Sequence, residues 1–506
     1  MGSTIQTCTT FIVAFISAYS LFFVYSLQNG QNSNNQNGIL ANLYVNQESI
    51  VTSYPSVSVS SNMKSIVQEQ VPSNAKDLSI TTDTIDKKDA KKEIVPPPVK
   101  EEVKAATIKR IYIDDNDNLF DSPGYMTSNR IVNDLGDNLF EVHRSCFDIS
   151  KNKLYIINSK GKIDGCHWMK CAFDFKFISM SSVNLFNQNR TIYSFDGDNV
   201  LLLMTTFQKH MTHFIEIFNY VLYYMHEYSR LPKINYLINP LYDSTQELSW
   251  INNYYDIVTE ELTRQFPILL MNAKEFAPYK DGLVCFKKLD VIGRITTYGI
   301  DGNNFLSRED AQMIRVLVYK KLGLSLNVPA NRRLHTLFIY REPAKYHTSS
   351  RLISNFEEIK STLNRHKDLI VQYTNFEAPS FKDQITIVSD TDIMITPCGA
   401  ALTNMIFMLP HSALVVLNEP WYGSLRFAEL APFSDIYYYP VMNLERKSLP
   451  PKCSIRYFNI MNNWADNGVC SYAVHYVEKY TVNVLHMMFM VNHARTAVQI
   501  NKYHNL

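Results

Sequence analysis

Short apolar strands that alternate with amphipathic helices constrain the fold of this chain more than any other feature. Strand-like runs at 235–239, 267–272 and 282–293 alternate with helical periodicity at 246–265 and 307–323. After a charged loop near residue 330 the alternation restarts, with strands at 334–341, 369–375, 392–397 and 413–419 and a helix at 354–368. Such alternation is typical of parallel sheets covered by helices on both faces. The sequence therefore predicts an α/β fold with two Rossmann-like halves, 106–330 and 331–506, that face a ligand-binding cleft.

Local signals predict several individual elements. Residues 144–158 predict a hairpin, and the apolar periodicity of 207–231 predicts one long helix that Pro232 ends. A Ser-x-x-acid capping signal begins at Ser307 and another at Ser354. We therefore expect a helix to start at each of these serines.

The chain begins with an uncharged apolar run. Residues 9–27 carry no charged side chain and approach the ~20 residues that a helix needs to cross a bilayer. We expect a single-pass transmembrane anchor after a cytoplasmic tail of residues 1–8, with a cleaved signal peptide as the alternative. Residues 28–105 contain Gln, Asn, Gly and Ser tracts and a proline run between mixed charges, which predicts a disordered stem. This organisation predicts type II topology, with the body of the chain in the lumen.

The net charge and the cysteine content further limit the classes of function that this chain can have. Lys and Arg total 49 against 48 for Asp and Glu, so the chain lacks the global positive field that holds nucleic acid. One of the 8 cysteines borders the apolar run, and the odd remainder leaves at least one without an intrachain disulfide. Cys166 and Cys171 predict a small disulfide loop or two buried thiols, because no second ligand pair follows at zinc-site spacing. Asn189 begins a glycosylation sequon.

A turn of small residues follows the strand at 392–397. Gly399, Ala400 and Ala401 open a predicted helix that runs to about residue 409. Small side chains let a ligand approach the backbone, and the N–H groups at a helix start favour a phosphate. The segment predicts a diphosphate site, and a tight turn packed on small residues is the structural alternative.

The same segment resembles the signature of a known family. The matching residues are Asp392, Gly399, Ala400, Leu402, Thr403, Asn404, Phe407, Pro410 and Pro420. Three other blocks match in order: Arg144 to Asp148, His213 to Glu216, and Phe338 to Arg341 with Arg351 to Glu358. On these residues the chain resembles glycosyltransferase family 61, which includes an EGF-domain-specific O-linked N-acetylglucosaminyltransferase and plant xylan glycosyltransferases.

The resemblance implies a GT-B-like fold and inverting transfer from a UDP-sugar to a hydroxyl of a glycoprotein or glycan, in the Golgi or endoplasmic reticulum. N-acetylglucosamine is the leading donor sugar, and xylose or another pentose is the alternative. The implied donor-binding residues are Arg341, Arg351, Cys398, Gly399, Ala400, Ala401, Leu402, Thr403 and Glu419. Guanidinium groups and a helix start can stabilise the leaving diphosphate, so this chemistry predicts neither a metal nor a cofactor. Either arginine can instead form a structural ion pair.

An inverting reaction needs a base that accepts the proton of the acceptor hydroxyl. His213 and Glu216 are three residues apart on a predicted helix and therefore share a face. They are the predicted catalytic residues, and the sequence does not decide between them or another carboxylate. A packed core histidine is the structural alternative for His213. A metal site that adds His210 is not predicted, because the His-Glu-x-x-His spacing is missing.

The chain departs from the family signature at several positions. Cys398 stands where the family has histidine, Ala401 replaces a glycine, and the late-strand acidic or amide position falls on Leu417. Glu419 lies two residues later on the same strand face and can substitute. A catalytically weak or inactive lumenal binding protein on the same fold is therefore the alternative hypothesis. A thiol at a helix start has a lowered pKa, so Cys398 is predicted to be the most reactive cysteine.

Overall fold

The computed structural model describes two large sheets, one two-stranded sheet and their helices. Tertiary contacts separate Pro97–Leu506, as one compact unit, from Met1–Pro96. The described residues all lie in the unit Pro97–Leu506: 105–111, 132–134, 139–151, 153–157, 176–180, 190–203, 210–292, 305–327, 333–342, 351–377, 379–420, 422–423, 425–442 and 477–503.

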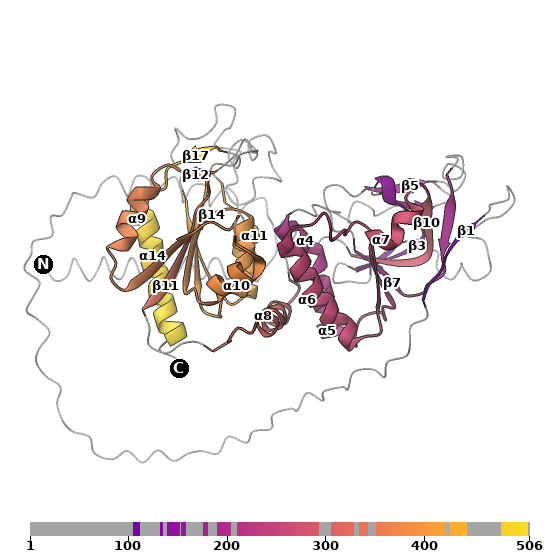
Figure 1. The fold of residues 1–506 in the computed structure, drawn as a ribbon, viewed down its shortest axis with the longest axis horizontal. Coiled ribbons are helices and arrows are strands. Elements are labelled where there is room, and N and C mark those ends of the chain that lie inside the picture. Colours follow the sequence, from indigo (N-terminus) through magenta and orange to yellow (C-terminus); the bar gives the residue numbers. More distant parts are fainter. Residues whose placement is uncertain are drawn as a thin grey trace, which may run out of the picture. The chain divides into compact units, whose positions relative to one another are not determined.

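The first sheet is ten-stranded and mixed (Figure 1). Its strands are β1 (Ile108–Ile111), β2 (Val132–Asp134), β3 (Leu139–Asp148), β4 (Lys153–Ile157), β5 (Lys176–Met180), β6 (Ile192–Phe195), β7 (Val200–Leu202), β8 (Tyr236–Asn239), β9 (Leu269–Asn272) and β10 (Leu283–Ile292). The main path runs β5-β4-β3-β10-β7-β8-β9. Strands β10, β7, β8 and β9 are parallel, as predicted, whereas β3 pairs antiparallel with β10. The predicted hairpin at 144–158 is confirmed as β3 and β4 with the short helix η1 (Ile149–Lys151) between them.

The helices of this half are α4 (Met211–Phe218), α5 (Tyr220–Glu227), α6 (Ser249–Gln265), α7 (Ala273–Phe276), η3 (Ala277–Tyr279) and α8 (Arg308–Leu322). The prediction of one helix over 207–231 is wrong, because the helix is interrupted at Asn219, where ψ is −12°. The Asn219 side chain accepts a hydrogen bond from the Tyr254 hydroxyl of α6 at 2.5 Å. This polar contact holds Asn219 against a neighbouring helix at the point where α4 ends.

One predicted helix start is confirmed and the other is wrong. Ser307 caps α8 by accepting a hydrogen bond from Asp310 N, and Gly323 ends that helix in the left-handed conformation at φ 71°. Asn355, not Ser354, is the N-cap residue of α9 (Phe356–Asn364). The Ser354 hydroxyl instead donates to the carbonyl of Tyr480 at 3.0 Å. A tertiary contact has therefore taken the group that the local pattern assigns to the cap.

The second sheet is five-stranded and entirely parallel, in the order β13-β11-β14-β15-β16. Its strands are β11 (Leu334–Ile339), β13 (Leu369–Thr374), β14 (Ile393–Pro397), β15 (Ala413–Leu417) and β16 (Tyr437–Val441). A separate pair joins β12 (Leu352–Ile353) to β17 (Lys479–Tyr480). The helices are α9, α10 (Phe381–Ser389), η4 (Ala400–Phe407), α11 (Leu425–Phe433), α14 (Val484–Val498) and the π-helix η7 (Gln499–Tyr503).

Helices cover both faces of this second sheet, as the apolar strands require (Figure 1). Helices α9 and α14 pack on one face, and α10, α11 and η4 pack on the other. The predicted helix that opens at Gly399 is a 3-10 helix rather than an α-helix. Helix α10 adds an element that the predicted pattern lacked, although Ser380 caps it by accepting from Asp383 N. This half therefore has two features of a Rossmann-like fold: its strands are parallel, and helices cover both faces of the sheet.

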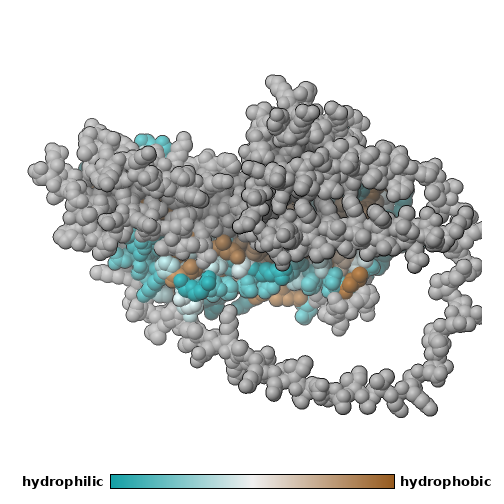
Figure 2. Space-filling model, turned by 180° about the vertical axis from the view of Figure 1, so that it is seen from behind, coloured by the Kyte–Doolittle hydropathy of each residue, from teal (hydrophilic) through white to brown (hydrophobic). Residues whose placement is uncertain are grey.

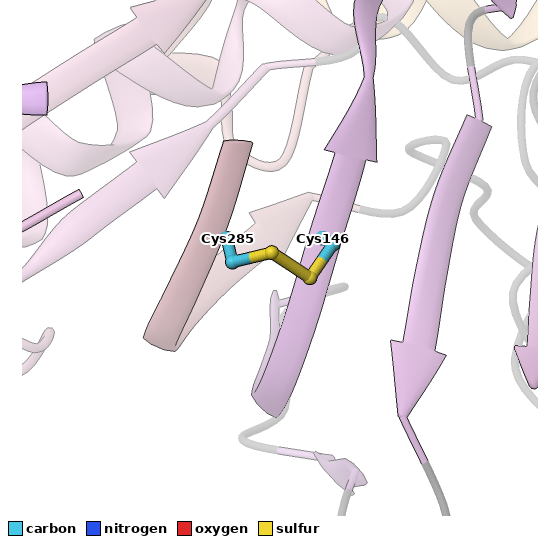
Figure 3. The surroundings of a disulfide bond; sticks show 2 residues. All are labelled: Cys146 and Cys285. Atoms are coloured by element: carbon cyan, nitrogen blue, oxygen red, sulfur yellow. A yellow bond between two sulfur atoms is a disulfide. The ribbon is translucent and has the colours of Figure 1, made fainter. Parts of the chain in front are cut away.

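A disulfide joins Cys146 of β3 to Cys285 of β10 (Figure 3). The two residues face each other in the antiparallel register, and both side chains are buried. The sequence left the disulfide connectivity open. Cys166, Cys171 and Asn189 lie outside the described residues, so the predictions for them remain predictions.

None of the helices in the described ranges is both long enough and apolar enough to cross a membrane. The predicted anchor at 9–27 and nearly all of the predicted stem at 28–105 lie outside these ranges. Where the molecular surface is described, Figure 2 shows hydrophilic and hydrophobic residues interspersed rather than gathered on one apolar face.

Candidate active site

The second sheet contains a strand-order reversal between β11 and β14. The chain passes from β11 to β13 on one side and then to β14 on the other side of β11. Ligands of open α/β sheets bind outside the carboxyl ends of the strands at such a reversal. Arg341 follows β11, and Gly399 follows β14. Two of the predicted donor-binding residues therefore lie at the position where this fold binds ligands.

Two guanidinium groups converge on the turn after β14. Arg341 Nη2 donates to the Cys398 carbonyl at 3.3 Å, and Arg351 Nη1 donates to the same oxygen at 3.0 Å. A Cβ atom added to Gly399 would collide with the Arg341 guanidinium and would lie 3.6 Å from Arg351 Nη1. Only a glycine at 399 thus allows both cations to approach the backbone this closely.

A buried carboxyl group completes this cluster. Glu419 Oε1 lies 3.6 Å from Arg351 Nη1, and its side chain is fully buried. Burial raises the pKa of Glu419 to about 7, against the opposing effect of Arg351 and Arg341. Burial and the neighbouring Arg351 also lower the pKa of Arg341. Two guanidiniums beside one carboxyl group leave a surplus of positive charge, which suits an anion such as a diphosphate.

The predicted catalytic pair lies on α4. His213 Nδ1 is 3.1 Å and 3.2 Å from the two carboxylate oxygens of Glu216, and Glu216 is buried. The neighbouring Thr212 hydroxyl contacts the Thr403 hydroxyl of η4 at 2.7 Å. The helix that carries the pair therefore packs directly against the helix that follows Gly399. The described residues contain no group of three or more His, Cys, Asp or Glu side chains arranged to hold a metal ion.

Part of the chain matches a known protein family. Residues 199–415 match the family model described as Glycosyltransferase 61, a span that includes α4, both arginines and the turn at Gly399. The chain contains a glycosyltransferase family 61 domain at 199–415. It is accordingly a glycosyltransferase enzyme. No curated protein matches the chain.

The family 61 signature contributes to the packing between elements as well as to the turn. Thr403 contacts Thr212, and the Asn404 side-chain oxygen accepts a hydrogen bond from Trp250 Nε1 of α6 at 2.9 Å. Leu402 is fully buried in the apolar core. The predicted donor-binding run therefore divides into the turn at Cys398 and Gly399, next to the arginines, and the helix η4, whose side chains contact α4 and α6.

Asp392 of the family 61 signature lies buried, and so does Cys398, which stands where the signature has histidine. Asp392 Oδ1 accepts a hydrogen bond from Lys502 Nζ at 2.8 Å, and the other oxygen accepts from His335 N at 2.8 Å. Asp392 therefore ties the start of β14 to β11 and to the π-helix η7. Cys398 carries a thiol and is only 1% exposed. Its predicted reactivity stays a prediction, and this burial restricts access to the sulfur.

The position of Arg351 depends on a strand that the family match does not include. Arg351 has a positive φ of 49°, and its N–H donates to the Val477 carbonyl at 3.1 Å. The adjacent β12 pairs with β17, and the Tyr480 hydroxyl of β17 donates to the carbonyl of Leu417 at 2.7 Å. Tyr480 is buried, and the charges of Glu419, Cys398 and both arginines act on it. Sequence analysis missed Tyr480, because only the pairing of two distant strands brings it to this site.

Proposed function

We propose that this glycosyltransferase transfers a sugar, with inversion, from a UDP-sugar to a hydroxyl group of a glycoprotein or glycan. The observation that carries the proposal is the convergence of Arg341 and Arg351 on the Cys398–Gly399 turn at the strand-order reversal. N-acetylglucosamine is the proposed donor sugar, with xylose or another pentose as the alternative. The family 61 domain supports glycosyl transfer itself.

The proposed chemistry follows from charge. As the bond between the anomeric carbon and the diphosphate breaks, negative charge develops on the leaving oxygen. Arg341 and Arg351 are placed before the reaction begins and would stabilise this charge by charge-assisted hydrogen bonds. The backbone at Gly399 would let the diphosphate approach without a side chain between them. Glu419, Ala400 and Ala401 complete the proposed donor side.

The proposed location is the membrane of the Golgi or endoplasmic reticulum, with type II topology and a lumenal body. The Cys146–Cys285 disulfide supports this proposal, because such bonds form and persist in oxidising compartments. The apolar run at 9–27 supplies the proposed anchor. Protease treatment of sealed microsomes tests the topology. Protection of the body from digestion is expected, and its digestion in intact vesicles would refute the lumenal orientation.

Calorimetric titration with UDP and a panel of UDP-sugars tests the donor site. Arg341→Ala and Arg351→Ala should each weaken UDP binding, because a hydrogen bond to a charged group contributes about 1.5–3 kcal/mol, or roughly tenfold to over a hundredfold in affinity. The matched control is Arg495→Ala, since Arg495 pairs with Asp368 through a partly exposed contact at 2.7 Å in the same half. Equal UDP affinity in wild type and both site variants, with unchanged melting, would refute the assignment.

A further inference from the structure

A second strand-order reversal lies in the first sheet, outside the donor site. The chain runs from β7 to β8 and β9 on one side, and β10 then pairs with the other side of β7. This reversal is therefore between β7 and β10, and the rule for open α/β sheets predicts a ligand crevice at their carboxyl ends. Helix α4, with His213, is the helix that follows β7. The crevice expected here lies on the half that does not hold the arginines.

Asp290 occupies the end of β10 at this reversal. It pairs in register with Leu201 of β7 and with Glu141 of β3. The side chain is 3% exposed, and Oδ1 has no hydrogen-bond partner among the described residues. Burying a polar oxygen without a hydrogen-bond partner is unfavourable, because the oxygen loses its bonds to water. Because the folded chain buries Asp290 Oδ1 despite this penalty, that oxygen is available to bind a ligand.

The charged neighbours of Asp290 are directed to another group. Lys288 Nζ lies 2.6 Å from Glu141 Oε2, and His143 Nε2 lies 2.8 Å from Glu141 Oε1. The described residues of β7 that adjoin Asp290 are apolar. Glu141 therefore contacts both Lys288 and His143, and these two side chains act on Asp290 only at longer range.

Three other buried carboxylates among the described residues accept hydrogen bonds that hold parts of the fold together, although Asp310 Oδ1, like Asp290 Oδ1, has no hydrogen-bond partner there. Asp148 pairs with Arg190 and accepts from Ser150; Asp392 accepts from Lys502 and His335 N; Asp310 accepts from Ser307 N. All three are fully buried, and each oxygen contact holds two elements or a helix start together. A purely structural role of this kind does not account for Asp290.

We propose that Asp290 is the general base of the transfer reaction. This inference rests on the proposed function. The acceptor hydroxyl oxygen forms a bond to the anomeric carbon, its proton passes to Asp290, and the bond to the diphosphate breaks with both electrons on the leaving oxygen. Asp290 then releases the proton to solvent. His213 and Glu216, which contact each other on α4, remain the residues that the sequence predicts for this role, and the variant below distinguishes them from Asp290.

The electrostatics of the site agree with this role. Burial raises the pKa of Asp290 to about 6, with Glu141 acting in the same direction and Lys288 and His143 opposing it. A base is most effective when its pKa is near the working pH, because it is then ionised and still holds a proton well. The reaction rate should therefore rise with pH through about 6 and level off above it.

UDP release from a UDP-sugar in the absence of an acceptor tests the inference, because water then replaces the acceptor hydroxyl. The probes are UDP-N-acetylglucosamine and UDP-xylose, used with the full chain. Asp290→Asn should lower the rate of UDP release at least a hundredfold, leave UDP affinity unchanged and abolish the rise of rate through pH 6. A positioned base contributes ~10²–10⁴-fold, which sets this expectation.

The matched control is Asp310→Asn. Asp310 is also buried, with its pKa raised to about 6 and its Oδ1 without a hydrogen-bond partner among the described residues, but its Oδ2 accepts hydrogen bonds from Ser307 N and Leu306 N at the start of α8. This variant should lower the melting temperature and leave the rate per folded molecule unchanged. UDP release by Asp290→Asn within threefold of wild type, or an unchanged pH profile, would overturn the inference. If the wild-type chain does not bind UDP, the proposed function is refuted, and the inference is refuted with it.

Discussion

Gly399→Ala tests whether UDP binding depends on the shape of the Cys398–Gly399 turn in addition to the charge of the arginines beside it. The added Cβ would occupy the space of the Arg341 guanidinium, so Arg341 would have to move and lose its 3.3 Å hydrogen bond to the Cys398 carbonyl. Neither arginine is removed. If displacement costs one charge-assisted contact to the diphosphate, about 1.5–3 kcal/mol, UDP affinity should fall roughly tenfold to over a hundredfold.

The assay is calorimetric titration with UDP, alongside thermal melting. The control is Gly323→Ala at the end of α8, where an added Cβ meets nothing within 4 Å but the backbone has φ 71°. That variant should lose about 1 kcal/mol or more of stability from the left-handed conformation and retain full UDP affinity. If Gly399→Ala binds UDP as tightly as wild type, the diphosphate does not lie against this turn, and the proposed donor site is wrong.

Three other changes give distinct outcomes. Lys502→Met should lower the free energy of unfolding by about 3–5 kcal/mol, measured by urea denaturation, because it leaves Asp392 as an uncompensated buried charge, and Asp392→Asn in the same chain should restore part of the loss. Burial raises the folded-state pKa of Glu419 to about 7, above its unfolded value, so ionisation of Glu419 should destabilise the fold progressively as pH rises from about 4.5 to 7. Glu419→Gln should remove up to about 3 kcal/mol of that pH dependence. An identical pH profile of stability in Glu419→Gln and wild type would contradict the assignment. Replacing Cys146 and Cys285 with serine should cost about 2–5 kcal/mol, and equal denaturation midpoints with and without reductant in the wild type would show that the disulfide does not contribute.

The sequence predicts the second half better than the first, for a physical reason. In a parallel sheet covered on both faces, the inner strands are buried apolar runs, and every residue of β14 and β15 is buried in this way. The first half includes antiparallel strands and a helix interrupted at Asn219. An interruption of this kind depends on Tyr254, a partner that local periodicity does not include.

The residues of the candidate site also divide into those that the sequence predicts and those that only the fold brings together. Gly399 was predicted because it follows a buried strand, and Arg341 and Arg351 were predicted through the resemblance to the family. Tyr480 and Asp290 were not predicted, since strand pairing rather than sequence spacing gives them their surroundings. The predicted cap at Ser354 was wrong for a related reason, because β17 offers its hydroxyl a better partner.

The dependence of Arg351 on β17 has a consequence for how the chain is made. Domains fold broadly in the order of their synthesis. The first sheet has all its strands once Ile292 has been added, and α8 is complete at Leu322. The second sheet, by contrast, lacks the partner of Asp392 until Lys502 has been translated, and Arg351 lacks its anchoring strand until Tyr480 has emerged. A growing chain should therefore acquire an ordered first half, 106–330, well before it can retain a nucleotide. Nonsense or frameshift changes after residue 415 would spare every residue of the family match and still leave the nucleotide side unfinished.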